Sequence, residues 1–182
     1  MNRLQLEHLL RAAGSISGQD RVIVIGSQSI LGARPDAPDS LLMSMEADFV
    51  FPDKPESSDI VDGTIGEGSI FHETYGYYAQ GVDASTAVLP AGWQSRLHEI
   101  DSPETRGTKG LCLDPADLVA SKYAAGREKD FEFIRQAFRH RVISEQLVLQ
   151  RLEMLPIDPE KIDVLKVKVR RDVDMAKELG LP

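Results

Sequence analysis

Apolar stretches alternate with polar, glycine-rich and proline-rich stretches through the first half of the chain. Residues 22–25 are a continuous β-branched run, which is typical of a buried strand. Residues 41–51 form a longer apolar stretch, stopped by Pro52, that predicts a second strand. The intervening residues predict a short helix at 28–33 and a Pro/Asp-rich loop at 34–40. This part of the chain therefore begins as two strands joined by a short helix and a loop.

The residues around these two strands predict further helices and strands. The leucines in residues 4–10 have helical spacing, and Gly14 predicts the end of that helix. Ser57 to Asp59 can begin another short helix, whereas the glycines at 63, 66 and 68 predict a loop. Further strands are expected within residues 75–83, 86–89, 95–102 and 110–113.

The pattern changes to helical spacing after residue 113. Asp114 is a plausible N-cap, with Pro115 in the first helical position, and residues 127–140 continue as an amphipathic helix. Ser144 caps a further helix, and an Asp-Pro pair at 158–159 starts the last one. We therefore predict an α+β fold, in which a mixed β-sheet flanked by helices occupies residues 1–113 and a C-terminal helical segment, residues 114–182, packs on that core.

Composition narrows the class of protein. The formal net charge of -8 argues against broad, non-specific nucleic-acid binding, which needs a basic surface. A single cysteine, Cys112, excludes an intrachain disulfide and a cysteine-based zinc cluster. The N-terminal residues carry charges among their apolar positions, unlike a signal peptide, and no apolar run approaches the length of a membrane span. We therefore expect a cytoplasmic protein.

Two short motifs carry candidate chemistry. Gly26 and Ser27 directly follow the first strand, where backbone amides at the start of the next helix can approach a phosphate; the simpler alternative is a turn. Glu46 and Asp48 are two residues apart on the second strand, so their side chains point to the same face. Such a pair of carboxylates can bind Mg²⁺, or can belong to a solvated acidic face.

A glycine-rich stretch before residue 78 offers a second set of candidates. His72 can act as a proton carrier. Tyr75, Tyr77 and Tyr78 can form a stacking platform for a base, or can simply pack on the sheet.

The combination of these motifs resembles the nucleotidyltransferase superfamily with the polymerase-β type of fold. VIGS (24–27) and MEADFVF (45–51) take the places of that family's Gly-Ser turn and acidic strand motif. The stretch 113–138 resembles the Lys-x-x-Ala and Arg-x-Lys-Asp segments of minimal and toxin-type members, and 71–97 resembles uncharacterised bacterial proteins related to abortive-infection and toxin–antitoxin nucleotidyltransferases. The resemblance covers roughly residues 1–140.

The resemblance implies roles for individual residues. It makes Glu46 and Asp48 the Mg²⁺ ligands and catalytic acids, with Lys122 as a third catalytic residue. The substrate-binding residues it implies, with His72 added from its position in the glycine-rich stretch, are Gly26, Ser27, His72, Arg127, Lys129 and Asp130.

The sequence departs from the family pattern at three points. The spacer between the Gly-Ser turn and the acid pair is longer than usual, and the first acid is Glu46 where the family usually has Asp. The family's third carboxylate should lie on a following strand, and the candidates near the predicted strand are Glu67, Glu73 and Asp83.

These features predict Mg²⁺-dependent transfer of a nucleotide from a nucleoside triphosphate to a hydroxyl of an RNA or protein acceptor, as in toxin–antitoxin systems. A protein partner encoded by a neighbouring gene is also expected. The alternative is a catalytically degenerate member of the same fold that acts as a partner-binding or antitoxin-like module. The position of the third carboxylate distinguishes the two.

Overall fold

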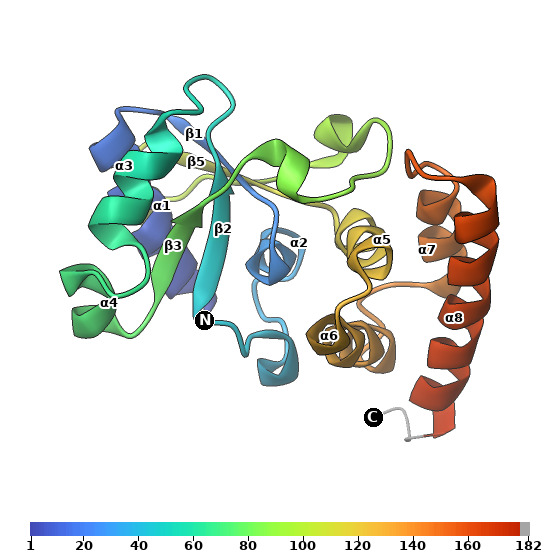
Figure 1. Ribbon diagram of the computed structural model, residues 1–182. Coiled ribbons are helices and arrows are strands. Elements are labelled where there is room, and N and C mark those ends of the chain that lie inside the picture. Colours follow the sequence, from blue (N-terminus) through green and yellow to red (C-terminus); the bar gives the residue numbers. More distant parts are fainter. Residues whose placement is uncertain (179–182) are drawn as a thin grey trace. The chain divides into compact units, whose positions relative to one another are not determined.

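The computed structural model describes residues 1–178, which divide into two compact units. Unit 1 comprises residues 1–86 and 97–113, and unit 2 comprises residues 87–96 together with the chain from 114 onward. A mixed sheet with helices in unit 1 and a group of helices in unit 2 confirm the predicted α+β class (Figure 1).

Unit 1 is built on a five-stranded sheet with the order β3-β2-β1-β5-β4. β1 pairs antiparallel with β2 and parallel with β5; β2 pairs parallel with β3, and β4 pairs antiparallel with β5. The sheet is therefore mixed, with β3 and β4 at its edges. The strands are β1 (Arg21–Val24), β2 (Glu46–Val50), β3 (Tyr78–Gly81), β4 (His98–Ile100) and β5 (Lys109–Cys112).

Four helices accompany this sheet. α1 contacts α3 and the sheet, α3 lies along β3, α2 lies against β4 and β5, and α4 follows α3. The helix α1 continues through Gly14 to Ser17, so the predicted end at Gly14 was wrong. A side chain at Gly14 would meet Thr108 at 2.0 Å, so this glycine allows close packing, and the helix ends instead at Gly18 with φ 68°. The helices are α1 (Arg3–Ser17), α2 (Ile30–Ala33), α3 (Ser57–Ile65) and α4 (Ile70–Tyr75).

Three other local predictions differ from the structure. The strand predicted from residue 41 begins only at Glu46, because Asp39–Leu41 form a 3₁₀ turn and the carbonyls of Leu42 and Ser44 accept hydrogen bonds from the N-terminal amine (both 2.6 Å). Gly63 lies inside α3, and α4 occupies part of the predicted loop because Ser69 caps it by accepting from the His72 N–H (3.1 Å). Residues 86–89 form no strand.

Cys112 is fully buried in unit 1, as expected for a small apolar residue. A side chain at Gly32 would meet its Cβ at 2.4 Å, so α2 packs directly on it. Burial raises the pKa of the Cys112 thiol to about 12.

We therefore expect Cys112 to be inert in the folded protein, because only the thiolate reacts. At pH 8, Ellman's reagent should modify the native protein at least about 100-fold more slowly than the protein unfolded in guanidinium. Equal rates in the two states would show that Cys112 is reached by solvent.

Unit 2 consists of four α-helices and the separate segment 87–96. α5 packs on α6 and α7, and α8 packs on α6 and α7. The N-caps predicted at Asp114 and Ser144 are confirmed, since each side chain accepts a hydrogen bond from a backbone N–H of the first turn (3.0 and 3.3 Å). The helices are α5 (Pro115–Ala125), α6 (Glu128–Arg139), α7 (Glu145–Leu152) and α8 (Pro159–Glu178), and their buried apolar residues include Val119, Ile134, Val148, Leu152 and Val169.

The first break in the helical region beyond residue 113 comes at Gly126. Gly126 has φ 64° and ends α5, so residues 115–139 form two helices rather than a continuous one.

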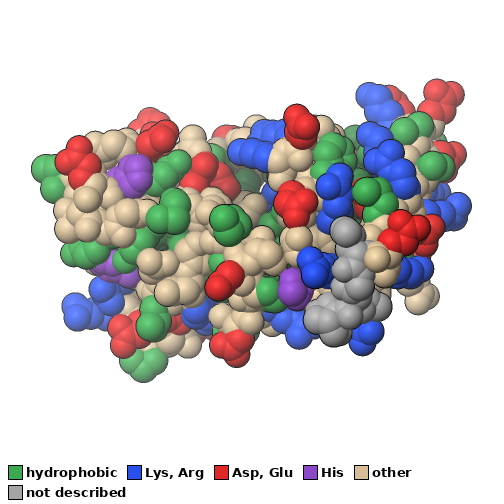
Figure 2. Space-filling view, turned by 90° about the horizontal axis from the view of Figure 1, so that it is seen from below, with side chains coloured by type: hydrophobic (Ala, Val, Ile, Leu, Met, Phe, Trp, Pro, Cys, Tyr) green, Lys and Arg blue, Asp and Glu red, His purple; other side chains and the backbone are tan. Residues whose placement is uncertain are grey.

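The face of the molecule shown in Figure 2 is mixed in charge. On the face shown in Figure 2, Lys and Arg side chains are interspersed with Asp and Glu rather than gathered in a broad basic patch. Among the helices within residues 1–178, none combines the length and the apolar character needed to cross a membrane.

Candidate active site

The turn that follows β1 lies against β2. β1 ends at Val24, and Gly26 and Ser27 begin the next turn. The N–H of Ile25 donates a hydrogen bond to the carbonyl oxygen of Asp48 (3.1 Å), which extends the contact between the two strands beyond β1. The Gly-Ser turn and the acidic motif, more than a dozen residues apart in sequence, are therefore neighbours in unit 1.

The alternation of β2 separates its acids from the core. Ala47 and Phe49 are fully buried on one face. Glu46 and Asp48 point to the other face and are half-buried. The two carboxylates therefore share one face of the sheet, as the sequence predicts.

Gly26 lets the carboxylate of Asp48 approach the backbone of the turn. A Cβ at position 26 would lie 1.5 Å from Asp48 Oδ2 and 2.7 Å from its Cγ. The space that any other residue would fill is thus occupied by the carboxylate itself. This contact is specific to glycine and links the two motifs atom to atom.

Tyr78 on β3 extends the site across the sheet. It is in register with Glu46, and its hydroxyl donates a hydrogen bond to Glu46 Oε2 (3.4 Å). Burial is the largest cause of a raised pKa at Tyr78, and the charges of Glu46, Glu67 and Asp48 raise this pKa further. Tyr78 therefore remains a neutral donor beside a group of carboxylates.

His72 belongs to the same cluster. Its ring centroid lies 4.6 Å from that of Tyr78, with an angle of 50° between the planes. The Gly68 N–H donates to His72 Nδ1 (3.0 Å), so in the neutral ring the proton is on Nε2. His72 is therefore next to the acid pair, through Tyr78, rather than in a separate loop site.

The candidates for a third carboxylate differ in position. Asp83 is exposed, and hydrogen bonds from the Ser85 side chain and from the Ser85 N–H (2.8 Å) lower the pKa of Asp83. The residue in register with Asp48 on β3 is Gln80, an uncharged amide. Glu67 is close enough to affect the pKa of Tyr78. Across the described part of the chain, however, no three His, Cys, Asp or Glu side chains are grouped as a metal site.

Two carboxylates still fit one kind of metal binding. Mg²⁺ usually keeps several waters and is held by one or two carboxylates together with substrate phosphates. Glu46 and Asp48 offer such a pair, and the turn at Gly26 brings backbone amides beside it. The donor set therefore suits Mg²⁺ that arrives with a nucleotide, rather than a dedicated cage of protein ligands.

The remaining predicted site residues belong to unit 2. Lys122 and Asp130 pair with each other at 2.5 Å, and Lys122 Nζ also lies 4.8 Å from the centroid of the Phe133 ring. Arg127 is the N-cap residue of α6, and both it and Lys129 are exposed. The buried partner in this segment is therefore Asp130, and its charge is balanced by Lys122 within the same unit.

Comparison with known proteins identifies the family. A family model described as nucleotidyltransferase of unknown function (DUF6036) matches residues 4–177. The chain belongs to this nucleotidyltransferase family. Searches of curated proteins and of solved structures gave no match. The match confirms the nucleotidyltransferase superfamily that was predicted from the Gly-Ser turn and the acid pair, over residues 4–177.

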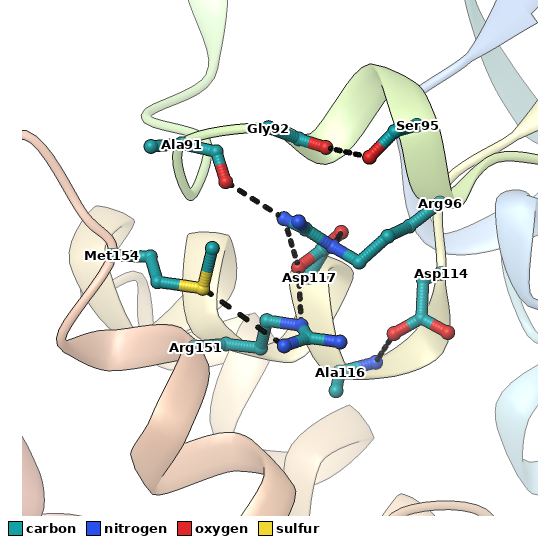
Figure 3. Close-up of polar contacts among 9 residues, drawn as sticks. All are labelled: Ala91, Gly92, Ser95, Arg96, Asp114, Ala116, Asp117, Arg151 and Met154. Atoms are coloured by element: carbon teal, nitrogen blue, oxygen red, sulfur yellow. Dashed lines mark hydrogen bonds and ion pairs between the residues drawn. The ribbon is translucent and has the colours of Figure 1, made fainter.

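A buried group of charges in unit 2 of this nucleotidyltransferase has no counterpart among the predicted site residues. Asp117 is fully buried. It accepts two hydrogen bonds from Arg96, at 2.8 Å from Nε and 3.1 Å from Nη2 (Figure 3). Arg151 Nε lies 2.9 Å from the Oδ1 of Asp117 as an ion pair, at an angle unfavourable for a hydrogen bond. We call these three residues the Arg-Asp-Arg triad.

The triad attaches segment 87–96 to the helices. Arg96 also donates to the carbonyl of Ala91 (3.1 Å; Figure 3). The Ala91 N–H in turn donates to the carbonyl of Met154 (2.7 Å). Burial raises the pKa of Asp117, and the two arginines oppose that change. These contacts have a structural role, because they hold segment 87–96 against the helices of unit 2.

Asp117 lies in the first turn of α5, outside the motifs that the sequence analysis singled out. Its partner Arg96 lies 21 positions earlier in the sequence, and its partner Arg151 lies on α7. No local sequence pattern therefore indicates either contact. Tyr78 was considered only as part of an aromatic platform, because its pairing with Glu46 depends on the register between β2 and β3, which no local pattern gives.

Proposed function

We propose that this nucleotidyltransferase moves a nucleotide from a nucleoside triphosphate to a hydroxyl group of an RNA or protein acceptor, with Mg²⁺ as cofactor. Glu46 and Asp48 would hold the metal, and Gly26 and Ser27 would hold the phosphates. Bound Mg²⁺ would polarise the attacking hydroxyl and neutralise phosphate charge during in-line displacement.

One observation carries the proposal. The carboxylate of Asp48 occupies the place of a side chain at Gly26, so a metal bound to Asp48 would lie beside the amides of the turn. Phosphate oxygens can then contact the metal and these amides together. This arrangement favours a metal–nucleotide site over a solvated acidic face, because a solvated face does not require glycine at position 26.

The chain's cations have a supporting role in this proposal. Lys122, Arg127 and Lys129 would neutralise charge on the leaving pyrophosphate. Within unit 2, the ammonium group of Lys122 pairs with Asp130 and lies over the Phe133 ring.

The biological setting follows from the resemblance alone. We propose a cytoplasmic enzyme that acts with a protein partner from a neighbouring gene, in the manner of toxin–antitoxin nucleotidyltransferases. The mixed charge of the surface favours an acceptor recognised at a defined site over general binding to nucleic acid (Figure 2).

A second function has its own support. Gln80 occupies the position in register with Asp48, and no third acidic or histidine ligand completes a metal site in the described residues. These two facts favour a partner-binding module in which the site has lost turnover. Nucleotide binding without transfer would be the signature of that alternative.

Isothermal titration tests the site directly. Each of ATP, CTP, GTP and UTP is titrated with Mg²⁺ into wild type and into a Glu46→Ala/Asp48→Ala variant. We expect metal-dependent binding of at least one nucleotide by wild type, and at least about 100-fold weaker binding by the variant, because the metal loses both protein ligands.

The sheet provides a matched control. Glu99 and Asp101 are also two acids spaced by one residue, at the edge strand β4, where both pair with Lys109 (2.9 and 3.4 Å). A Glu99→Ala/Asp101→Ala variant removes the same charge and should bind nucleotide like wild type. If wild type binds no nucleotide at millimolar concentration, the proposed activity is wrong.

A further inference from the structure

The two acids of β2 are fixed in different ways. Asp48 has a short side chain, and its carboxylate is packed against the backbone at Gly26. Glu46 has an additional methylene group and therefore an additional torsion that must be fixed before the carboxylate can bind a metal. The Glu46 carboxylate meets the hydroxyl of Tyr78 at 3.4 Å.

Tyr78 is itself held from two sides. Backbone pairing of β2 with β3 puts it in register with Glu46, so both side chains lie on the same face. On its other side, the His72 ring packs 4.6 Å away. His72 is fixed in turn by two hydrogen bonds. Its ring Nδ1 accepts from the Gly68 N–H (3.0 Å), and its backbone N–H donates to the Ser69 hydroxyl (3.1 Å).

These contacts connect the start of α4 to the acid pair through successive side chains. The Gly68–Ser69 turn fixes His72, His72 packs on Tyr78, and Tyr78 donates to Glu46. The bond from Tyr78 to Glu46 is long for a hydroxyl–carboxylate pair. Bonds of this kind commonly shorten when a metal or substrate orders the site.

We propose that Tyr78 is a positioning residue that orients the Glu46 carboxylate toward the metal, and that His72 acts by holding Tyr78. This inference rests on the proposed metal–nucleotide site and adds residues that act through Glu46. It also accounts for a glutamate at position 46: the longer side chain reaches a fixed hydroxyl on the neighbouring strand, which then restricts its extra torsion.

The test measures metal affinity in a Tyr78→Phe variant, which keeps the ring against His72 and removes only the hydroxyl. Free Mn²⁺ is followed by electron paramagnetic resonance, with and without the nucleotide that wild type binds best. We expect Mn²⁺ affinity to fall about 10-fold, since loss of a group that orients a metal ligand typically weakens binding by 10- to 100-fold. Nucleotide affinity at saturating metal should stay unchanged.

Tyr77→Phe is the matched control. Tyr77 is adjacent in sequence and also uses its hydroxyl, in a hydrogen bond with His8 Nδ1 (2.8 Å) away from the acid pair. This variant should retain wild-type Mn²⁺ affinity. A double-mutant cycle adds a second readout: in a Glu46→Asp background the shorter acid cannot reach the hydroxyl, so Tyr78→Phe should have no further effect.

The outcomes separate the two proposals. Equal Mn²⁺ affinity in wild type and Tyr78→Phe, while Glu46→Ala/Asp48→Ala loses the metal, would overturn the role of Tyr78 and leave the metal site intact. Equal losses in Tyr78→Phe and Tyr77→Phe would show a general effect on the sheet and would also overturn it. If wild type binds neither Mn²⁺ nor nucleotide, the proposed function fails and this inference fails with it.

Discussion

Replacing Gly26 with alanine should lower Mg²⁺-dependent nucleotide binding, and any transfer activity, by about 100-fold or more, because misplacement of a reacting or ligand group by about 1 Å can cost this much. The new Cβ would lie 1.5 Å from Asp48 Oδ2, so the carboxylate must turn away from the turn. The obstructing atom is the end of a flexible side chain, so the fold can absorb the change. We therefore expect a large loss of binding in titrations and a thermal unfolding midpoint close to that of wild type.

Gly63→Ala is the control for this variant. Gly63 lies inside α3, and a side chain there would meet nothing within 4 Å. Alanine is also the better helix former, so this change should preserve binding and leave stability equal or slightly higher. A Gly26→Ala protein that binds nucleotide as tightly as wild type would contradict the idea that the turn and Asp48 act together.

Asp117→Ala should destabilise the protein by about 3–5 kcal/mol, which is the usual effect of removing one partner from a buried ion pair. Asp117 is fully buried between Arg96 and Arg151, so its loss removes the carboxylate that these two guanidinium groups share. Urea unfolding measures the change. Trp93 is the single tryptophan and belongs to the same segment as Arg96, so its fluorescence reports directly on unit 2.

Asp163→Ala tests whether the effect comes from burial. Asp163 is also an acid on a helix of unit 2, and it pairs with Lys166 at 3.2 Å, but it is largely exposed. Exposed pairs of this kind contribute little, so the unfolding midpoint should hardly move. Similar midpoints for Asp117→Ala and wild type would mean that the triad contributes nothing to stability.

The fold was predictable where the local signal and the tertiary environment agree. The β-branched run at 22–25 is a buried strand, and Asp114 and Ser144 cap helices as predicted. Glycine misled the prediction twice. Gly14 was interpreted as a helix end and Gly63 as part of a loop, yet both lie inside helices. For Gly14 the reason is long-range, because it faces Thr108, which no local window includes.

The site was predictable as two motifs and not as a set of contacts. Strand alternation correctly puts Glu46 and Asp48 on one face, and the strand–turn pattern suggests that Gly26 is near them. The direct contact of Gly26 with Asp48 depends on the antiparallel pairing of β1 with β2. The cluster with Tyr78 and His72 likewise depends on the register of β3 and on the cap of α4.

The chain passes between its two units at three points, after residues 86, 96 and 113. Neither unit is therefore a continuous stretch of sequence, and a fragment truncated after Leu113 would carry Arg96 without Asp117. During synthesis, Arg96 leaves the ribosome before either α5, which carries Asp117, or α7, which carries Arg151, has been made. Segment 87–96 can pack on α5 and α7 only after both helices have been synthesised, so unit 2 can fold only when most of the protein has been made. For the same reason of connectivity, proteolytic cleavage of a single peptide bond cannot release either unit intact.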